Sequence, residues 1–271
     1  MGRPMEKIGL IAGNRRFPIV FSQAAKRRNA YIVAVAIKGE TSPSLKNYVD
    51  KIYWIRLAEF GRLFEIFKAE GVTRVLMAGQ ISPYRLFSKE VAANKDIQNL
   101  LASIKDKKAH TIFAAIADKL KEHHLQLLDS TTYLEELLPP KGVLTRTQPS
   151  AHTWEDIEFG VSLAREVARL DIGQTIAVKS KAIVAVEAFE GTDNLIRRAG
   201  RLVQGGLVIV KVSMPSQDMR FDIPVIGLHT VKTCLQAHVA CLAIEANKTL
   251  CIDRQASVAL ADKKSLSIVA A

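Results

Sequence analysis

The chain has 271 residues, of which 48% are hydrophobic and 24% charged, and its formal net charge is +11. This balance is typical of a soluble globular protein with one large or two small domains. No apolar run approaches the roughly 18–20 residues of a membrane-spanning helix, and the N-terminal apolar stretch is too short for a signal peptide, so we expect a cytoplasmic protein.

The first half of the chain alternates short apolar runs with segments of helical spacing. Strands are predicted over residues 8–12, 31–37, 51–55, 74–78 and 125–128. Helices are predicted over residues 18–28, 59–70, 89–104 and 109–123. In the second of these helices the apolar residues form one stripe, and Gly71 ends the helix. The alternation predicts an α/β fold with a parallel sheet flanked by helices.

The pattern breaks near Leu138-Pro139-Pro140, and the residues that follow have no periodicity up to Ser150. We therefore place a linker at residues 139–150, between an N-terminal domain (1–138) and a C-terminal α/β domain (151–271). The C-terminal domain is predicted to contain a helix over 154–170, strands over 182–186 and 206–210, a strand-like segment over 220–227 and a helix over 230–246.

The three cysteines, Cys234, Cys241 and Cys251, have no metal-binding spacing, so we interpret them as reduced core thiols, with the first two on one helix face. The positive charge favours anionic partners, such as nucleotides, nucleic acid or an anionic membrane surface. The chain has no basic motif interleaved with aromatic residues, which argues against nucleic acid.

Two glycine turns follow predicted strands, at Gly13-Asn14-Arg15 and at Gly79-Gln80. Both come at the C-terminal ends of strands, where backbone N–H groups and a helix N-terminus can bind a ligand phosphate. The first turn fits neither GxGxxG nor a Walker pattern, so an ordinary strand–helix turn is the alternative.

Three acids lie within seven residues in the stretch VEAFEGTDNLIRR: Glu187, Glu190 and Asp193. Glu187 is predicted at the end of a largely buried strand, where an unpaired charge is costly. Gly191 permits a sharp turn, and Thr192 or Asp193 would cap the next helix. The acids indicate a polar site; the alternative is that Asp193 is only a cap and the glutamates pair with arginines.

A second polar stretch, KVSMPSQDMRFDIPVIG, contains Lys211, Arg220 and Asp222. Lysine and arginine suit oxyanions, and aspartate suits a hard cation or a water. Acids without a His/Cys cluster favour magnesium, with manganese as the alternative, over zinc. Acids, a hard metal and cationic side chains together are what phosphoryl transfer requires.

Several motifs occur in an order that covers nearly the whole chain: GLIAG with FP (9–18), AEFGRLFEIFKAEGV (58–72), MAGQIS (77–82), LDIGQ (170–174), VEAFEGTDNLIRR (186–198) and DIPVIG (222–227). Together they resemble the UDP-2,3-diacylglucosamine pyrophosphatase family of lipid A biosynthesis. The resemblance implies a Rossmann-like N-terminal domain, a distinct C-terminal α/β domain and a homodimer. It also implies a magnesium-dependent hydrolase in which water attacks the α-phosphorus of UDP-2,3-diacylglucosamine to give UMP and 2,3-diacylglucosamine 1-phosphate.

The resemblance places the catalytic aspartate in DIPVIG, at Asp222, where it would bind the metal or position the water. We expect Lys211 and Arg220 to stabilise charge, and Asp222, Glu187, Glu190 and Asp193 to contact the metal or water. The expected substrate-binding residues are Gly13, Asn14, Arg15, Gly79, Gln80, Gln174, Gly191 and Thr192. The first turn departs from the family, which carries AGGG where this chain has Ala12-Gly13-Asn14-Arg15. We also expect peripheral docking on the inner membrane.

Two other functions remain as alternatives. A nicotinamide-dependent sugar-nucleotide enzyme would need a ribose-binding acid after the second strand, and Glu40 is the nearby candidate. A basic RNA- or lipid-binding protein without enzymatic activity is the other alternative.

Overall fold

The structure, a computed structural model, describes residues 5–82, 85, 98–99, 102, 104, 106, 109–215, 217–221 and 223–271. Asp222 and most of the predicted helix over 89–104 therefore lie outside the described residues. The chain forms two compact units. The N-terminal unit comprises Met1–Glu135 and Asp218–Asp222, and the C-terminal unit comprises Glu136–Gln217 and Ile223–Ala271.

The N-terminal unit contains a five-stranded sheet in the order β3-β2-β1-β4-β5, in which every paired strand is parallel. The strands are β1 (Lys7–Ala12), β2 (Tyr31–Ile37), β3 (Lys51–Ile55), β4 (Arg74–Ala78) and β5 (Gln126–Leu127). Strands β2 and β3 follow β1 on one side of the sheet, and β4 then pairs with β1 on its other side. The predicted parallel sheet is confirmed, and its topological switch point lies between β1 and β4.

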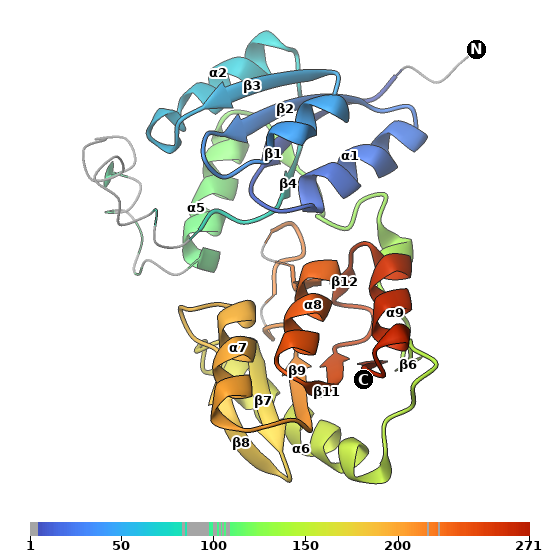
Figure 1. Cartoon of the computed structure of the whole chain (residues 1–271). Coiled ribbons are helices and arrows are strands. Elements are labelled where there is room, and N and C mark those ends of the chain that lie inside the picture. Colours follow the sequence, from blue (N-terminus) through green and yellow to red (C-terminus); the bar gives the residue numbers. More distant parts are fainter. Residues whose placement is uncertain are drawn as a thin grey trace. The chain divides into compact units, whose positions relative to one another are not determined.

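Helices cover the two faces of this sheet (Figure 1). They are α1 (Phe17–Arg27), α2 (Arg62–Ala69) and α5 (Ala109–Glu122), with short 3₁₀ turns η1 (Pro43–Asn47) and η2 (Leu57–Glu59), and η4 (Glu135–Leu137) at the boundary of the two units. Apolar residues of α2 and α5 share one core cluster with Ile11 of β1 and with alternate residues of β2 and β4. Helix α1 contacts β2 and β4 but contributes nothing to that cluster, so it packs on the opposite face.

The C-terminal unit contains a six-stranded mixed sheet in the order β6-β13-β11-β9-β7-β8. Its strands are β6 (Gly142–Val143), β7 (Thr175–Lys179), β8 (Ala182–Val186), β9 (Leu207–Lys211), β11 (Val239–Ile244) and β13 (Ser267–Ala270). Strands β9, β11 and β13 are parallel, whereas β6, β7 and β8 join by antiparallel pairing. A separate two-stranded sheet pairs β10 (Val225–Ile226) with β12 (Leu250–Cys251).

Four helices flank the six-stranded sheet: α6 (Ala151–Arg169), α7 (Thr192–Leu202), α8 (Leu228–Gln236) and α9 (Arg254–Lys263). Buried residues of α6 form one core cluster with the sheet, and those of α7, α8 and α9 form another. Figure 1 shows α7, α8 and α9 on one face of the sheet and α6 on the other. The expected distinct C-terminal α/β domain is thus confirmed.

The helix predicted over 230–246 is wrong in its second half. Helix α8 ends at Gln236, and the chain turns at His238, which has a φ of 50°. Residues 239–244 then form β11, a central strand. A short, continuously apolar run fits a buried strand as well as a helix, and here the left-handed residue separates the two. Cys234 and Cys241 therefore lie on different elements, although both are buried, reduced thiols.

Among the helices that the structure describes, none is long and apolar enough to cross a bilayer.

Candidate functional site

A buried polar array lies where β8 leads into α7. The Thr192 hydroxyl donates to Glu187 Oε1 at 2.9 Å, and Lys211 Nζ donates to the same hydroxyl at 2.9 Å. Glu187 is 8% exposed and Lys211 is 7% exposed. Burying either charge alone would cost several kcal/mol, so opposite charges on one hydroxyl offset much of that cost. The array brings together three of the predicted site residues.

The local sequence explains this geometry. Gly191 has a φ of 81° and is the N-cap of α7, so Thr192 and Asp193 are the first helical residues rather than caps. Strand β8 lies at one edge of the sheet and is more exposed than we expected, with Ile183 42% exposed. Glu187 nevertheless follows it into a buried position. The first turn of α7 therefore presents backbone N–H groups beside the array.

Glu187 Oε2 is buried and accepts no hydrogen bond from any described residue. A buried carboxylate oxygen without a donor is costly, and such orphans in native proteins call for a missing partner. The array therefore has one acceptor that a cation or a ligand donor could satisfy.

The other two acids of the stretch point to other partners. Glu190 forms an ion pair with Arg198, which raises the pKa of that guanidinium through hydrogen bonding. Asp193 Oδ2 lies 3.3 Å from His229 Nε2. Within the described part of the chain, no three His, Cys, Asp or Glu side chains converge as a metal site. The alternative of pairing with an arginine thus holds for Glu190. Glu187 instead accepts a hydrogen bond from Thr192, whose hydroxyl in turn accepts one from Lys211.

The LDIGQ block packs directly beneath Glu187. A Cβ at Gly173 would lie 2.1 Å from the Glu187 carbonyl oxygen, so only glycine fits there. The Glu187 amide donates to the Thr175 carbonyl at 2.8 Å, and the Thr175 and Thr192 hydroxyls lie 3.3 Å apart. Sequence reasoning assigned Gln174 to the site but missed Gly173 and Thr175, although Gly173 lies within that motif and Thr175 directly follows it.

Gln174 supports the strand end that carries Lys211. Its carbonyl accepts the Val212 amide at 2.9 Å, and its side-chain amide lies 3.5 Å from Gln217 Oε1. Glu245, which sequence reasoning also missed, accepts both the amide and the hydroxyl of Ser213. Burial alone would raise the pKa of Glu245, but hydrogen bonds from Ser213 and Lys248 outweigh burial and hold that pKa below its ordinary value.

In the N-terminal unit, the two glycine turns lie against each other at the switch point. The Gly13 amide donates to Ala78 O at 2.8 Å, and the Asn14 amide donates to Gln80 O at 2.7 Å. A Cβ at Gly13 would lie 2.5 Å from Gln80 O, and one at Gly79 would lie 2.5 Å from Asn14 O. The glycines therefore allow the two turns to bond backbone to backbone.

Asn14 and Glu40 extend these turns into a side-chain network. Asn14 Nδ2 donates to Glu40 Oε2 at 2.9 Å, and the same oxygen accepts from the amide and hydroxyl of Ser82. The Glu40 side chain is only 3% exposed, and Asn14 Oδ1 is buried without a described partner. Glu40 is thus occupied by protein donors, which removes the acid that the nicotinamide-dependent alternative needs. Arg15, the last residue of the first glycine turn, is exposed at a φ of 63°.

Arg220 belongs to the N-terminal unit and is bound by a neighbour. Its guanidinium forms a two-pronged hydrogen bond with Asp218, at 2.9 Å from Nε to Oδ1 and 2.6 Å from Nη2 to Oδ2. This contact raises the pKa of Arg220 and lowers that of Asp218. Arg220 also lines a hollow of about 480 Å³ beside α5 and β5, with Asp118, Lys121 and Gln126.

Comparison with known families accounts for the chain from end to end. A model described as "LpxI N-terminal domain" matches residues 7–137, and one described as "LpxI C-terminal domain" matches residues 140–269. The chain belongs to the LpxI family. A relative named UDP-2,3-diacylglucosamine pyrophosphatase LpxI, from Caulobacter vibrioides, is 28% identical over 98% of this chain and 97% of its own length.

Two solved structures show a distant likeness to this LpxI family member. A biotin carboxylase domain of a thermophilic 2-oxoglutarate carboxylase has a TM-score of 0.29 at 12% identity, covering 74% of this chain and 33% of that one. An N5-carboxyaminoimidazole ribonucleotide synthetase from Thermotoga maritima has a TM-score of 0.24 at 13% identity, covering 70% and 43%. The chain thus spans less than half of either structure, and neither likeness carries an argument about it.

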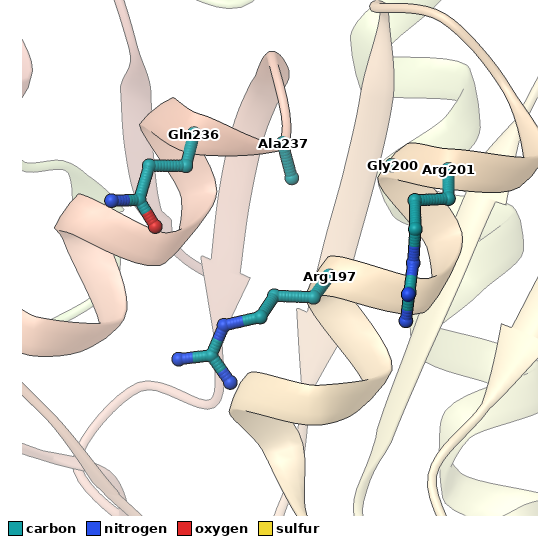
Figure 2. A pocket seen from close by; sticks show the side chains of 5 residues that line it. All are labelled: Arg197, Gly200, Arg201, Gln236 and Ala237. Carbon is teal, nitrogen blue, oxygen red and sulfur yellow. The ribbon is translucent and has the colours of Figure 1, made fainter.

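Another hollow, of about 330 Å³, lies in the LpxI C-terminal domain between α7 and α8 (Figure 2). Arg197, Arg201 and Gln236 line it together with Gly200 and Ala237, which lie so close that a Cβ at Gly200 would be 2.7 Å from Ala237 Cβ. Gly200 is eight residues along α7 from Thr192, which corresponds to about 12 Å of helix. This hollow is therefore separate from the array around Glu187.

Proposed function

We propose that this LpxI family member hydrolyses the diphosphate of UDP-2,3-diacylglucosamine in lipid A biosynthesis. The proposal is supported by the name of the Caulobacter vibrioides relative and by the family match over both halves of the chain. The observation that carries it is the buried array of Glu187, Thr192 and Lys211 at the start of α7.

This array has the chemistry that diphosphate hydrolysis requires. The Lys211 ammonium and the N-terminal amides of α7 supply positive charge for phosphate oxygens in a place shielded from water. The Glu187 carboxylate can orient a water or accept its proton. Arg220 is proposed as a second cation that stabilises phosphate charge. It would bind phosphate once its hydrogen bonds with Asp218 are broken.

We propose that water attacks the α-phosphorus, which breaks its bond to the bridging oxygen and leaves 2,3-diacylglucosamine 1-phosphate. The attacking oxygen then becomes part of UMP. Attack on the β-phosphorus would instead place that oxygen in the lipid product. Hydrolysis in H₂¹⁸O followed by mass spectrometry distinguishes the two: label in UMP supports α attack, and label in the lipid phosphate contradicts it.

A divalent cation, magnesium or alternatively manganese, would add positive charge beside the diphosphate. Glu187 Oε2 fits such a cation because it is a buried, unpartnered carboxylate oxygen. Glu190 and Asp193 would have to leave Arg198 and His229 to join it. EDTA should abolish UMP release and added magnesium should restore it; full activity in EDTA would exclude the metal.

Asp222 is proposed as the residue that positions the attacking water. Asp222→Asn keeps the shape of the side chain and removes its negative charge, so we expect unchanged folding and a loss of turnover on the order of 10²–10⁴-fold. Hydrolysis at the wild-type rate by folded Asp222→Asn would overturn this role.

We further propose that the protein is a homodimer that works in the cytoplasm on the surface of the inner membrane. The net charge of +11 supports docking on anionic lipid, and the substrate carries acyl chains. Light scattering tests the dimer. Sedimentation with anionic and with neutral vesicles tests the docking, which should depend on anionic lipid and weaken as salt is added.

A further inference from the structure

The turn at residues 129–132 holds a segment that comes from far along the chain. The Ser130 amide donates to the Met219 carbonyl at 2.8 Å, and the Ser130 hydroxyl lies 2.9 Å from the Arg220 carbonyl. The same hydroxyl lies 3.0 Å from the Met77 carbonyl of β4. Ser130 is 1% exposed, so its own amide and hydroxyl find their partners within the protein rather than in water.

Ser130 is itself held rigidly. Asp129 Oδ1 accepts the Thr131 amide at 2.8 Å, and the Asp129 carbonyl accepts the Thr132 amide at 3.0 Å. An aspartate that binds the amide two residues later fixes a tight turn. The turn thus orients the Ser130 amide towards the distant segment.

The segment at residues 218–221 packs into the N-terminal unit as part of its core. Phe221 is 5% exposed and belongs to the cluster of α2 and α5, with its ring centroid 6.0 Å from that of Phe113. The Phe221 amide donates to Asp218 O at 3.1 Å, which closes the segment into a turn. The family models divide the chain near residue 138, yet this turn from the C-terminal half completes the N-terminal core.

We propose that Ser130 is a positioning residue for the reaction. By binding the Met219 and Arg220 carbonyls, it fixes the backbone from which the Arg220 side chain extends and which leads into the DIPVIG motif. This inference rests on the proposed function, in which Arg220 stabilises phosphate charge. A merely structural serine would affect stability alone, whereas a positioning serine affects the chemical step.

Ser130→Ala and Ser22→Ala form a matched pair. Ser22 is also fully buried in the N-terminal unit, where its hydroxyl donates to the Pro18 carbonyl at 2.8 Å, but it does not touch the segment. We expect Ser130→Ala to lower kcat at least tenfold with KM changed less than threefold, and Ser22→Ala to change both less than twofold. A wild-type kcat in folded Ser130→Ala, or an equal loss in Ser22→Ala, overturns the proposal.

Hydrogen exchange separates this inference from the proposed function. Amides of residues 218–221 should exchange at least tenfold faster in Ser130→Ala than in the wild type and Ser22→Ala; equal exchange overturns the positioning role. If the wild-type protein releases no UMP, the proposed function fails while the exchange result still decides whether Ser130 holds the segment. If Ser130→Ala does not fold, Phe221→Leu takes its place, because it replaces the buried ring with a smaller apolar side chain and keeps the serine. It should show the same faster exchange and lower kcat, and wild-type values for it overturn the proposal.

Discussion

The Lys211 ammonium lies 2.9 Å from the Thr192 hydroxyl, although the two residues are 19 positions apart. Strand β9 carries the lysine and the first turn of α7 carries the threonine. Because the hydroxyl also donates to Glu187, one small side chain connects a buried base with a buried acid. Thr192 is therefore the residue on which the array depends.

Thr192→Val should remove this connection while keeping the shape of the side chain. Glu187 and Lys211 would each lose a hydrogen bond inside the protein, which costs about 1–3 kcal/mol for each buried group left unsatisfied. We expect a lower free energy of unfolding in urea and at least a tenfold lower kcat. Thr192→Ser retains the hydroxyl and should recover most of both quantities; equal losses in the valine and serine variants would show that the hydroxyl is not what matters.

Gly173→Ala should displace Glu187. The added Cβ would lie 2.1 Å from the Glu187 carbonyl oxygen, so the backbone has to move, at a cost of roughly 1–3 kcal/mol or more. Urea unfolding measures the stability and UMP release measures the effect on the site. The control is Gly61→Ala, since a Cβ there meets nothing within 4 Å and Gly61 has a φ of −55°. A Gly173→Ala protein as stable and active as Gly61→Ala would contradict the close packing.

Acid should weaken the hydrogen bonds by which Glu245 holds Ser213 in the loop after β9. Glu245 has a folded pKa below its ordinary value of 4.5. The folded state thus binds this proton less tightly than the unfolded chain, so the ionised carboxylate stabilises the fold fully above the ordinary pKa. That stabilisation is lost as the pH falls through the lower folded pKa. The difference in unfolding free energy between the wild type and Glu245→Gln should be greatest near neutral pH and shrink below pH 4.5; a constant difference from pH 8 to pH 3 would contradict it.

The three cysteines should resist thiol reagents in the folded protein. Burial raises the pKa of the Cys241 thiol to about 12 and that of Cys251 to about 11, and it raises the pKa of Cys234 further. Because the thiolate is the reactive form, modification at neutral pH should be slow. Three thiols should react after denaturation in guanidinium. Rapid labelling of any of them under native conditions would show that its core opens locally.

The sequence predicts the N-terminal sheet well because each of its strands is a short apolar run followed by a break. Gly71, for example, has a φ of 63° where the prediction ends a helix. The C-terminal unit was harder to predict, since β11 continues the apolar run of α8 and only the conformation of His238 separates them. Strand β7 has no alternation of polar and apolar residues, because it lies between β8 and β9 and is buried on both faces.

The candidate site was predicted in part. Acids beside a glycine and a helix start indicated Glu187 and Thr192, and the structure brings both to Lys211. Sequence spacing could not indicate that Glu190 and Asp193 face Arg198 and His229, because pairing depends on how α7 and α8 pack. Ser130 had no signal at all, since its partners Met77 and Arg220 lie 53 and 90 residues away along the chain.

The most direct test of the account is to incubate the purified protein with UDP-2,3-diacylglucosamine and magnesium and to identify the products by mass spectrometry. We expect UMP and 2,3-diacylglucosamine 1-phosphate in equal amounts, with both strongly reduced in Thr192→Val. Recovery of intact substrate, or cleavage that releases UDP instead of UMP, would contradict it.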